Sequence, residues 1–501
     1  MSRRLFAFAA ALLAIVLVVA VATRRSASPP ATSAAPSEQQ EPGAGEPALG
    51  EAGSEEGHGG NPEAAEQAES TEKRLEALAE ARANGTLGVD TAALASSPAA
   101  GWAGEYVVDR KADDWEPAVA ADPNAPYVYV VTTRYGVGKP CKGNCPDPWM
   151  ALTISKDGGA TWGDQVPLCA CKGGGQFDPI IEVAPNNGDV YAVYMNGYNV
   201  VFIRSPDHGK TWSDPVETYG KVAWNDKPVL ATSDDGRDVY ISWNGPKGGD
   251  PWIAQSHDRG KTWTQLRLKS TDRYFYAFDA DVTHGGRVIF AETGVQYASS
   301  VGLAGTTKVY AFVSTDRGTT WKTVVVDSFP VGLQSTERAD FYVGHAALSA
   351  DDAGHLVIAY DAPTTSYGLQ RIYTRRSTDG GMTWTTARAQ SAEGEMATAP
   401  AIESTGDGDV RMFYYQTTNG GDVDAWNVWY RSSTDGGTTW TAPVKISDAS
   451  GSAAYKVTGG FLEPYGDYGE MGITSTGKTI AAWGEGTSYI GPGGVWVNRQ
   501  T

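Results

Sequence analysis

One octapeptide pattern, Ser-x-Asp-x-Gly-x-Thr-Trp, occurs six times in this chain of 501 residues. The copies begin at residues 155, 205, 256, 314, 377 and 433, so successive copies lie 50 to 63 residues apart. A period in this range is typical of a repeat architecture, in which each repeat forms one supersecondary unit. This spacing constrains the fold more than any other feature of the sequence.

The segments between the copies share one order of elements. Each has two apolar, β-branched stretches joined by a Gly, Asp or Asn turn, then a variable loop, a third stretch and the octapeptide. In the first repeat the expected strands are residues 117–121, 127–133, 150–155 and 161–168. Four short antiparallel strands per repeat are typical of a β-propeller blade.

The chain has seven such units but only six octapeptides, because the last unit ends at the C-terminus without the turn or a fourth strand. Residues 105–110 precede the first unit, and we expect them to supply the missing outer strand and close the ring. This closure would remove two open sheet edges. The predicted fold is therefore all-β, a seven-bladed propeller of four-stranded antiparallel blades over residues 101–501, with six blades as the alternative.

The octapeptide is the Asp-box motif, also called the BNR repeat, and residues 101–501 resemble the sialidase-like β-propellers. This superfamily includes exo-sialidases, other glycosidases, lyases and non-catalytic proteins, so the resemblance implies a fold and not a single activity. It implies that the motif lies between the third and fourth strands of a blade. The motif's Asp can accept backbone N–H bonds in its own turn, and its Trp can pack between sheets. We therefore expect the six aspartates to be structural.

The N-terminal part differs from the repeats in composition. Arg3 and Arg4 precede an apolar run over residues 5–22, which fits a secretory signal peptide or an uncleaved membrane anchor. Residues 26–100 contain no aromatic residue, and we expect a disordered acidic stalk with one short helix at residues 71–83. The predicted domains are thus a signal or anchor (1–25), a stalk (26–100) and a propeller (101–501), placed outside the cytoplasm and either secreted or anchored.

The formal net charge of the chain is −19. A surface this acidic argues against nucleic acid and against anionic membranes as partners of the propeller. We expect a monomer whose partner is a glycan or polysaccharide.

Four cysteines fit an oxidising compartment. Cys141 and Cys145 form a C-x3-C pair, and Cys169 and Cys171 form a C-x-C pair. A bridge between Cys169 and Cys171 would close a strained small ring, so we expect two disulfides that join one pair to the other. A four-thiolate zinc site is the alternative.

If the octapeptides mark one end of the blades, the loops at the other end form the binding face. The stretches that begin the first strand of several blades are acidic and would converge near the central channel. Their candidate catalytic residues are Glu116, Asp178, Asp226, Asp279 and Asp467. Like charges there would raise some pKa values or recruit a cation such as Ca²⁺, and no motif implies another cofactor.

The sialidase resemblance implies further residues at this face. It calls for a Tyr–Glu pair, for which Tyr465 or Tyr468 with Glu463 are candidates, and for three arginines that bind the substrate carboxylate. The candidate arginines are Arg134, Arg273, Arg338 and Arg371. Other candidate substrate-binding residues are Glu292, Asp361, His345, Trp115, Trp224 and Tyr276.

The leading hypothesis from the sequence is an extracytoplasmic glycoside hydrolase of the sialidase type that acts on glycans. The Arg-Ile-Pro element that sialidases carry before their first Asp box is absent, and seven units are counted where catalytic sialidases have six blades. Two alternatives therefore stay open: a non-catalytic propeller that binds a glycan or protein, and a polysaccharide lyase.

Overall fold

The structure is a computed structural model. It describes residues 62–85 and 98–501 apart from residues 110, 139, 170–173, 223–224, 246–248, 270–272, 300–301, 334–343, 421–424, 448–459, 487 and 489. All described residues belong to one compact unit, Glu56–Thr501. Within this part of the chain, no helix combines the length and apolar character needed to cross a bilayer. The apolar run at residues 5–22 lies outside the described residues.

The described residues form seven four-stranded antiparallel sheets, which are the predicted blades. Blade 1 contains β2 (Asp113–Ala121), β3 (Val128–Tyr135), β4 (Trp149–Ser155) and β5 (Val166–Pro167). Blade 2 contains β6 (Gln176–Val183), β7 (Val190–Asn196), β8 (Val200–Ser205) and β9 (Val216–Glu217). Blade 3 contains β10 (Asp226–Thr232), β11 (Val239–Gly245), β12 (Asp250–Ser256) and β13 (Thr264–Arg267). Blade 4 contains β14 (Tyr274–Val282), β15 (Val288–Ser299), β16 (Gly302–Ser314) and β17 (Lys322–Pro330).

The remaining three blades follow the same order. Blade 5 contains β18 (Ala346–Ala350), β19 (Leu356–Pro363), β20 (Gln370–Ser377) and β21 (Arg388–Ala389). Blade 6 contains β22 (Ala397–Thr405), β23 (Asp409–Gln416), β24 (Asn427–Ser433) and β25 (Val444–Lys445). Blade 7 contains β26 (Glu463–Ile473), β27 (Thr479–Gly486), β28 (Gly493–Arg499) and β1 (Tyr106–Val107). The first strands of neighbouring blades contact one another all the way round, from β2 through β26 and back to β2.

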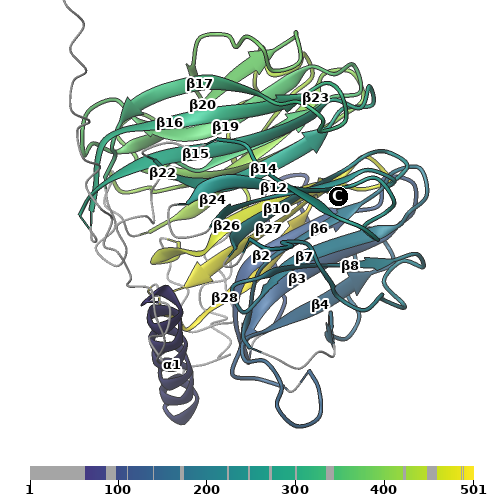
Figure 1. Ribbon diagram of the computed structural model, residues 1–501. Helices are drawn as coiled ribbons and strands as arrows, with labels where there is room; N and C mark the ends of the chain where they lie inside the picture. Colours follow the sequence, from purple (N-terminus) through teal and green to yellow (C-terminus); the bar gives the residue numbers. More distant parts are fainter. Residues whose placement is uncertain are drawn as a thin grey trace, which may run out of the picture. The chain divides into compact units, whose positions relative to one another are not determined.

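The ring closes as the sequence predicts. β1 precedes blade 1 in the chain but pairs with β28, so it is the outer strand of blade 7. Trp102 also bridges to Gln500, and Thr501 N donates to Gly101 O at 2.9 Å. Figure 1 shows the yellow strands of blade 7 beside the blue strands of blade 1. The two ends of the propeller are thus held together by a backbone ladder.

The hydrophobic core lies between the faces of neighbouring blades. Six of seven buried clusters each combine side chains of two adjacent blades, and the one between blades 7 and 1 closes the series. The seventh cluster joins blades 2 and 3 and extends to Trp115 and Tyr135 of blade 1 and Tyr465 of blade 7. The tryptophan of each octapeptide packs against the cluster between its own blade and the preceding one. Burial of this kind is the largest favourable term in folding. The repeated Trp therefore ties each blade to its neighbour.

The octapeptides form one hydrogen-bonded turn that recurs in all six copies. In the third copy, Ser256 Oγ donates to Asp258 at 2.8 Å, and the backbone N and hydroxyl of Thr262 donate to Asp258 at 2.9 and 2.7 Å. Gly260 has a φ of 76°, and a Cβ there would lie 2.1 Å from the Phe202 ring of the preceding blade. Equivalent Ser and Thr donors serve the aspartate in the other five copies. These aspartates are structural acceptors.

A helix, α1 (Pro62–Ala83), precedes the propeller. It ends at the predicted Ala83, before Asn84-Gly85, but it begins well before the predicted residue 71. Its sequence is rich in Ala and Glu, which are strong helix formers. Leu78 on this helix is 1% exposed, so part of the predicted stalk packs against the protein.

The cysteine pairing differs from the prediction. Cys141 and Cys145 form a disulfide with each other, across a Cα–Cα distance of 5.4 Å, and do not bridge to the second pair. The loop between β3 and β4 brings these two residues close enough for a local bridge. Cys169 is also disulfide-bonded, and Cys171 lies outside the described residues. With its thiolates consumed by this bond, the Cys141–Cys145 pair does not form the alternative zinc site.

Candidate functional site

The first strands of five blades begin with an unusual backbone conformation. One non-glycine residue in each has a positive φ between 45° and 59°, at the point where the pairing with the second strand skips residues. These residues are Glu116, Asp178, Lys227, Ala399 and Asp467. Positive φ is uncommon for residues with a Cβ, and such strain costs on the order of 1–3 kcal/mol per residue and often marks functional sites.

Four of the five strained residues immediately precede a proline, so the sequence signature is X-Pro. The bulge redirects the X side chain relative to a regular strand. The five positions carry two Asp, one Glu, one Lys and one Ala. The backbone device is therefore repeated, while the chemistry of its side chain varies from blade to blade.

Lys227 joins two of these carboxylates. Its Nζ lies 2.6 Å from Asp467 Oδ2 and 3.3 Å from Asp178 Oδ1. Although burial lowers the pKa of the Lys227 ammonium, the charges of Asp178 and Asp467 raise it well above its ordinary value. Lys227 is therefore a permanent cation at neutral pH, and its ammonium faces both carboxylates.

Glu116 belongs to the same group and contacts the backbone of Asp178. Its Oε2 accepts hydrogen bonds from Thr133 Oγ1 at 2.5 Å and from Asp178 N at 2.9 Å. Burial and the nearby Asp178 charge raise the pKa of Glu116 well above its usual range. Oxygens of Glu116, Asp178 and Asp467 lie within 4.8 Å of one another, a spacing that suits a divalent cation, and the ammonium of Lys227 supplies a positive charge to this group.

A cavity opens beside this group, with about 1070 Å³ of space including its mouth. Residues of the first strands of blades 2 to 7, or next to them, line it, among them Asp178, Lys227, Asp279, His345 and Asp467. We call this space the upper cavity. It lies at the opposite end of the third strands from the octapeptide turns, because those strands run into the octapeptides.

A second set of carboxyl groups lines the upper cavity and differs electrostatically from the first. Burial raises the pKa of Asp279 to about 8, although Leu348 N and Ala280 N donate to its oxygens. Burial and neighbouring carboxylates likewise raise the pKa of Glu182 and Glu470 well above the usual range. At neutral pH Asp279 therefore keeps its proton, whereas Asp178 and Asp467 face the Lys227 ammonium.

His345 reaches the cavity from blade 5. Its Nδ1 lies 3.2 Å from Asp361 Oδ2, which also accepts from Thr398 Oγ1 at 2.8 Å. Asp361 is fully buried, and an ionised Asp361 places the ring proton on Nδ1. The other ring nitrogen, Nε2, is then the one left to accept a proton in the cavity.

Two tyrosines line the same cavity, Tyr276 from β14 and Tyr468 from β26. The Tyr468 hydroxyl donates to Pro179 O at 3.4 Å. Burial and the charges of Asp178 and Glu116 raise the pKa of Tyr468 well above its ordinary value, so it remains a hydrogen-bond donor. Such rings offer flat apolar faces together with a polar group.

The structure does not bring the candidate arginines together. Arg134 is buried and bonded to Asp114 at 2.7 Å. Arg273 and Arg371 donate to backbone carbonyl oxygens, and none of these three lines the upper cavity. Arg338 lies outside the described residues. The guanidinium cluster implied by the sialidase resemblance is therefore absent among the described arginines.

The candidate Tyr465–Glu463 pair also lies elsewhere. Tyr465 is fully buried, its hydroxyl donates to Asp113, and its ring meets Trp115 edge-on at 4.1 Å. Glu463 pairs opposite Gly486 at the start of β26. None of these candidates lines the upper cavity.

Three further candidates are also placed apart from the cavity or left undescribed. Asp226 precedes Lys227 and does not line the cavity. Glu292 accepts from Ser242 Oγ at 2.5 Å, and burial raises its pKa to about 8. Trp224 lies outside the described residues.

Lys227 is the main residue that the sequence reading missed. An alignment of the strand starts by their acidic residues predicts the neighbouring Asp226 instead. Aligning the X-Pro dipeptides Glu116-Pro117, Asp178-Pro179 and Lys227-Pro228 would have found Lys227. Glu182 and Glu470 were missed because nothing in their local sequence separates them from an outward-facing strand residue.

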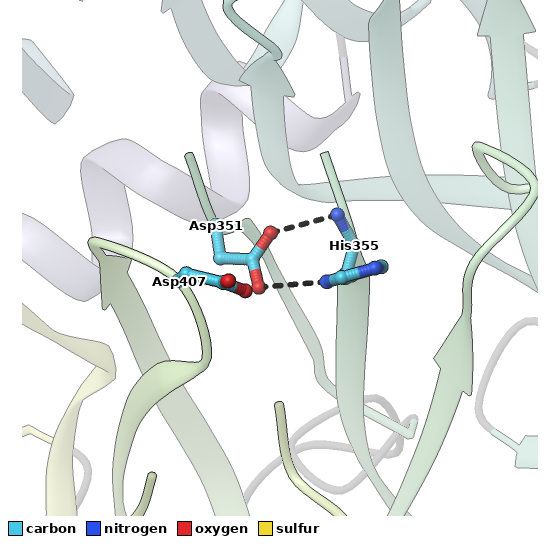
Figure 2. A group of neighbouring side chains, drawn as sticks. All are labelled: Asp351, His355 and Asp407. Atoms are coloured by element: carbon cyan, nitrogen blue, oxygen red, sulfur yellow. Dashed lines mark hydrogen bonds and ion pairs between the residues drawn. The ribbon is translucent and has the colours of Figure 1, made fainter. Parts of the chain in front are cut away.

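A different carboxylate group lies at the other end of the blades (Figure 2). Asp351 Oδ1 accepts from His355 N at 2.8 Å, and Oδ2 lies 3.1 Å from His355 Nδ1. Gly408 N of the next blade also donates to Asp351 at 3.1 Å, beside Asp407. These contacts hold the turn between β18 and β19 against blade 6.

No protein-family model matches the chain, and no curated protein matches it. Solved structures resemble the fold. An ulvan lyase, a polysaccharide lyase, is 15% identical, with 79% of this chain and 94% of that chain covered and a TM-score of 0.47. The intramolecular trans-sialidase from Ruminococcus gnavus is 13% identical over 66% and 95%, with a TM-score of 0.42. The NanB sialidase from Streptococcus pneumoniae is 13% identical over 78% and 69%, also with a TM-score of 0.42.

Proposed function

We propose that the protein is an extracytoplasmic glycoside hydrolase that cleaves glycans in the upper cavity. One observation carries the proposal: the same cavity holds two carboxylates paired with the Lys227 ammonium and a carboxyl, Asp279, whose pKa is raised to about 8. Glycoside hydrolysis uses one protonated and one ionised carboxyl group. Environments that push two carboxyl pKa values apart indicate which group is the acid and which the base.

In this scheme Asp279 is the general acid, which protonates the oxygen of the leaving sugar. Asp467 is the base or nucleophile, because its side chain is 13% exposed whereas that of Asp178 is 5% exposed. The Lys227 ammonium pairs with Asp467, and the rings of Tyr276 and Tyr468 contact the sugar. The disulfide of Cys141 with Cys145 supports the placement outside the cytoplasm.

The charge of the cavity bears on the substrate class. Five acidic residues line it, namely Asp178, Glu182, Asp279, Asp467 and Glu470, while the charge of Lys227 is already paired. None of the described arginines lines the cavity, so the carboxylate of an anionic sugar would find no guanidinium partner there. We therefore propose a neutral or amino-sugar substrate in place of the sialic acid expected from the sequence resemblance.

A polysaccharide lyase is the second candidate, and His345 favours it. A lyase needs a base that removes a proton from the sugar ring, and Asp361 orients His345 for that task. A lyase also has to neutralise the carboxylate of a uronic acid, for which Lys227 would have to exchange partners. Lyase action yields an unsaturated product that absorbs ultraviolet light, whereas hydrolysis yields none.

The test is a panel of neutral, amino-sugar and anionic glycans incubated with the whole protein. We expect new reducing ends from a neutral or amino-sugar glycan without ultraviolet absorbance. Asp279→Asn and Asp467→Asn should each lower kcat by about 10²- to 10⁴-fold, as expected for loss of an acid or base group. Glu463→Gln, a carboxylate outside the cavity, is the control and should retain turnover. Binding of a glycan without turnover by folded protein would instead favour a non-catalytic propeller.

A further inference from the structure

Arg74 of α1 fills a pocket on the propeller. Its guanidinium carbon lies 3.9 Å from the ring centre of Trp115, 5.2 Å from that of Tyr135 and 5.5 Å from that of Tyr465. Nη1 donates to the Tyr465 hydroxyl at 2.7 Å and lies 4.0 Å from Asp113 Oδ2. We call these four partners the guanidinium pocket. It encloses the Arg74 side chain, which is only 2% exposed.

The pocket needs the cation to be complete. Asp113 is fully buried, and burial raises its pKa to about 6, with Arg74 as the largest opposing influence. Removing one partner of such a buried pair leaves an uncompensated charge, unlike the loss of a surface ion pair. The aromatic faces of Trp115 and the tyrosines match a flat guanidinium rather than a compact ammonium.

The rest of α1 holds Arg74 at this place. Leu78 is buried, and a Cβ added to Gly136 would lie 2.8 Å from both Leu75 and Leu78. Arg82 donates to the backbone oxygen of Lys111 at 2.8 Å. The helix thus contacts the propeller along one stripe of side chains.

Two residues of the guanidinium pocket lie within two positions of a strained residue in the sequence. Trp115 is the residue before Glu116, and Tyr465 stands two residues before Asp467. Gly466, between Tyr465 and Asp467, packs on blade 1, since a Cβ there would lie 3.1 Å from Glu116 N. Glu116 and Asp467 have φ values of 52° and 59°, so their conformations persist only if the surroundings hold them.

We propose that Arg74 is a positioning residue for the upper cavity. By filling the guanidinium pocket, it fixes the start of β2 in blade 1 and that of β26 in blade 7, and so sets Asp467 against Lys227. A helix outside the repeats is then an integral part of the site. The effect on turnover rests on the proposed glycoside hydrolysis, whereas the effect on the Lys227 ion pair does not.

The first experiment measures the amine of Lys227 in Arg74→Met, by its rate of acylation followed by mass spectrometry. Asp467 raises the pKa of Lys227, so displacement of Asp467 should lower it. A fall of one pKa unit raises the neutral, reactive fraction of an amine about tenfold, and we expect a rate increase of that order. Glu76→Gln, at an exposed position on the same helix, should leave the rate within about twofold of the wild type.

Rescue by a small molecule separates positioning from general stability. Methylguanidinium at millimolar concentration should restore slow acylation of Lys227 in Arg74→Ala, because it can occupy the vacated pocket. Urea has a similar flat shape but no charge and should not restore it. Turnover should follow the same pattern, with kcat changing more than KM. If Lys227 responds as expected but no form of the protein cleaves a glycan, the positioning stands and the proposed function fails.

Unchanged Lys227 reactivity in folded Arg74→Met would overturn the proposal. If that variant does not fold, hydrogen exchange of the wild-type protein decides. We expect the amides of α1 and those at the starts of β2 and β26 to become exchangeable in one opening step. Exchange of α1 while the two strand starts remain protected would equally overturn it.

Discussion

The two ends of the blades carry two repeated devices that differ in one respect. The octapeptide turns repeat the same side chains, and every copy supplies the same Ser and Thr donors to its Asp. The strained strand starts repeat a backbone conformation, but their side chains are acidic, basic or apolar. The turns with identical side chains are structural. The strand starts with a shared backbone conformation but different side chains form the candidate site.

The pKa values follow the same division. Hydrogen bonds from Thr383 and Thr439 lower the pKa of Asp379 and Asp435 to about 2. At the other end, burial raises the pKa of Asp279 to about 8. A turn aspartate surrounded by donors is stabilised as an anion, while a cavity carboxyl without enough donors keeps its proton.

The largest expected effect is that of Lys227→Met. This change leaves Asp178, Asp467 and Glu116 without their cation, so their pKa values should rise and the ionised partner of Asp279 should be lost. We expect kcat to fall by about 10²- to 10⁴-fold. Lys445→Met, on the exposed outer strand of blade 6, is the control. Unchanged turnover in folded Lys227→Met would show that the strained strand starts are not the catalytic site.

The next largest effect is expected for Gly260→Ala, which tests the structural role of the octapeptide turns. The added Cβ would lie 2.1 Å from Phe202 in a conformation with a φ of 76°. Overpacking and backbone strain should lower the free energy of unfolding by about 2–4 kcal/mol, measured by urea denaturation. Turnover per folded molecule should not change. Gly406→Ala has a similar φ of 60° but open space around it, so it should cost about 1 kcal/mol and serves as the matched control.

A matched pair of Thr→Val changes compares the two ends directly. Thr133 donates to buried Glu116 at 2.5 Å, and Thr439 donates to exposed Asp435 at 2.7 Å. Loss of the buried bond leaves Glu116 without one of its donors, so it should cost about 1–3 kcal/mol in unfolding free energy and shift the pH profile of turnover. Loss of the exposed bond should cost about 0.5–1 kcal/mol and leave that profile unchanged. Equal effects on both measurements would contradict the division of roles.

The last comparison concerns the pH dependence of stability. Burial raises the pKa of Asp279 to about 8 and that of Asp281 and Asp113 to about 6, from 3.8. Between pH 4 and 8 the folded state therefore binds more protons than the unfolded chain, so these groups lower stability as pH rises. Asp379 and Asp435, with pKa values lowered to about 2, act in the other direction and contribute stability that is lost as pH falls from 4 to 2.

We therefore expect a higher Tm at pH 5 than at pH 8, measured by thermal unfolding at constant ionic strength. In Asp279→Asn this difference should become smaller, because one raised group is gone. A wild-type Tm that stays level or rises over the same interval would show that the cavity carboxyls are ionised at neutral pH. The assignment of Asp279 as the acid would then fail.

Much of the fold could be predicted because its signals are local and repeated. Counting strand pairs rather than octapeptides gave seven blades, and the unpaired stretch at residues 105–110 gave the closing strand. The octapeptide turns were predictable because Asp, Gly and Trp act within one turn and its nearest neighbour. None of these inferences needed the position of a distant residue.

The site was less predictable because it depends on contacts between distant residues. Asp178 and Asp467 were chosen as acidic strand starts, but the Lys227 that joins them follows from a bulge in a third blade. Arg74 lies in a segment whose composition suggested a solvated stalk, and only its partners Trp115 and Tyr465 make it a buried residue.

The pairing of β1 with β28 also determines when the propeller can close during synthesis. Residues 106 and 107 leave the ribosome early, yet their partners are Trp496 and Val497. At elongation rates of about 5–20 residues per second, roughly 20 to 80 seconds separate the two strands. Throughout that interval the nascent chain carries an unfilled seventh blade. The ring of seven blades can therefore close only after β28 has been translated.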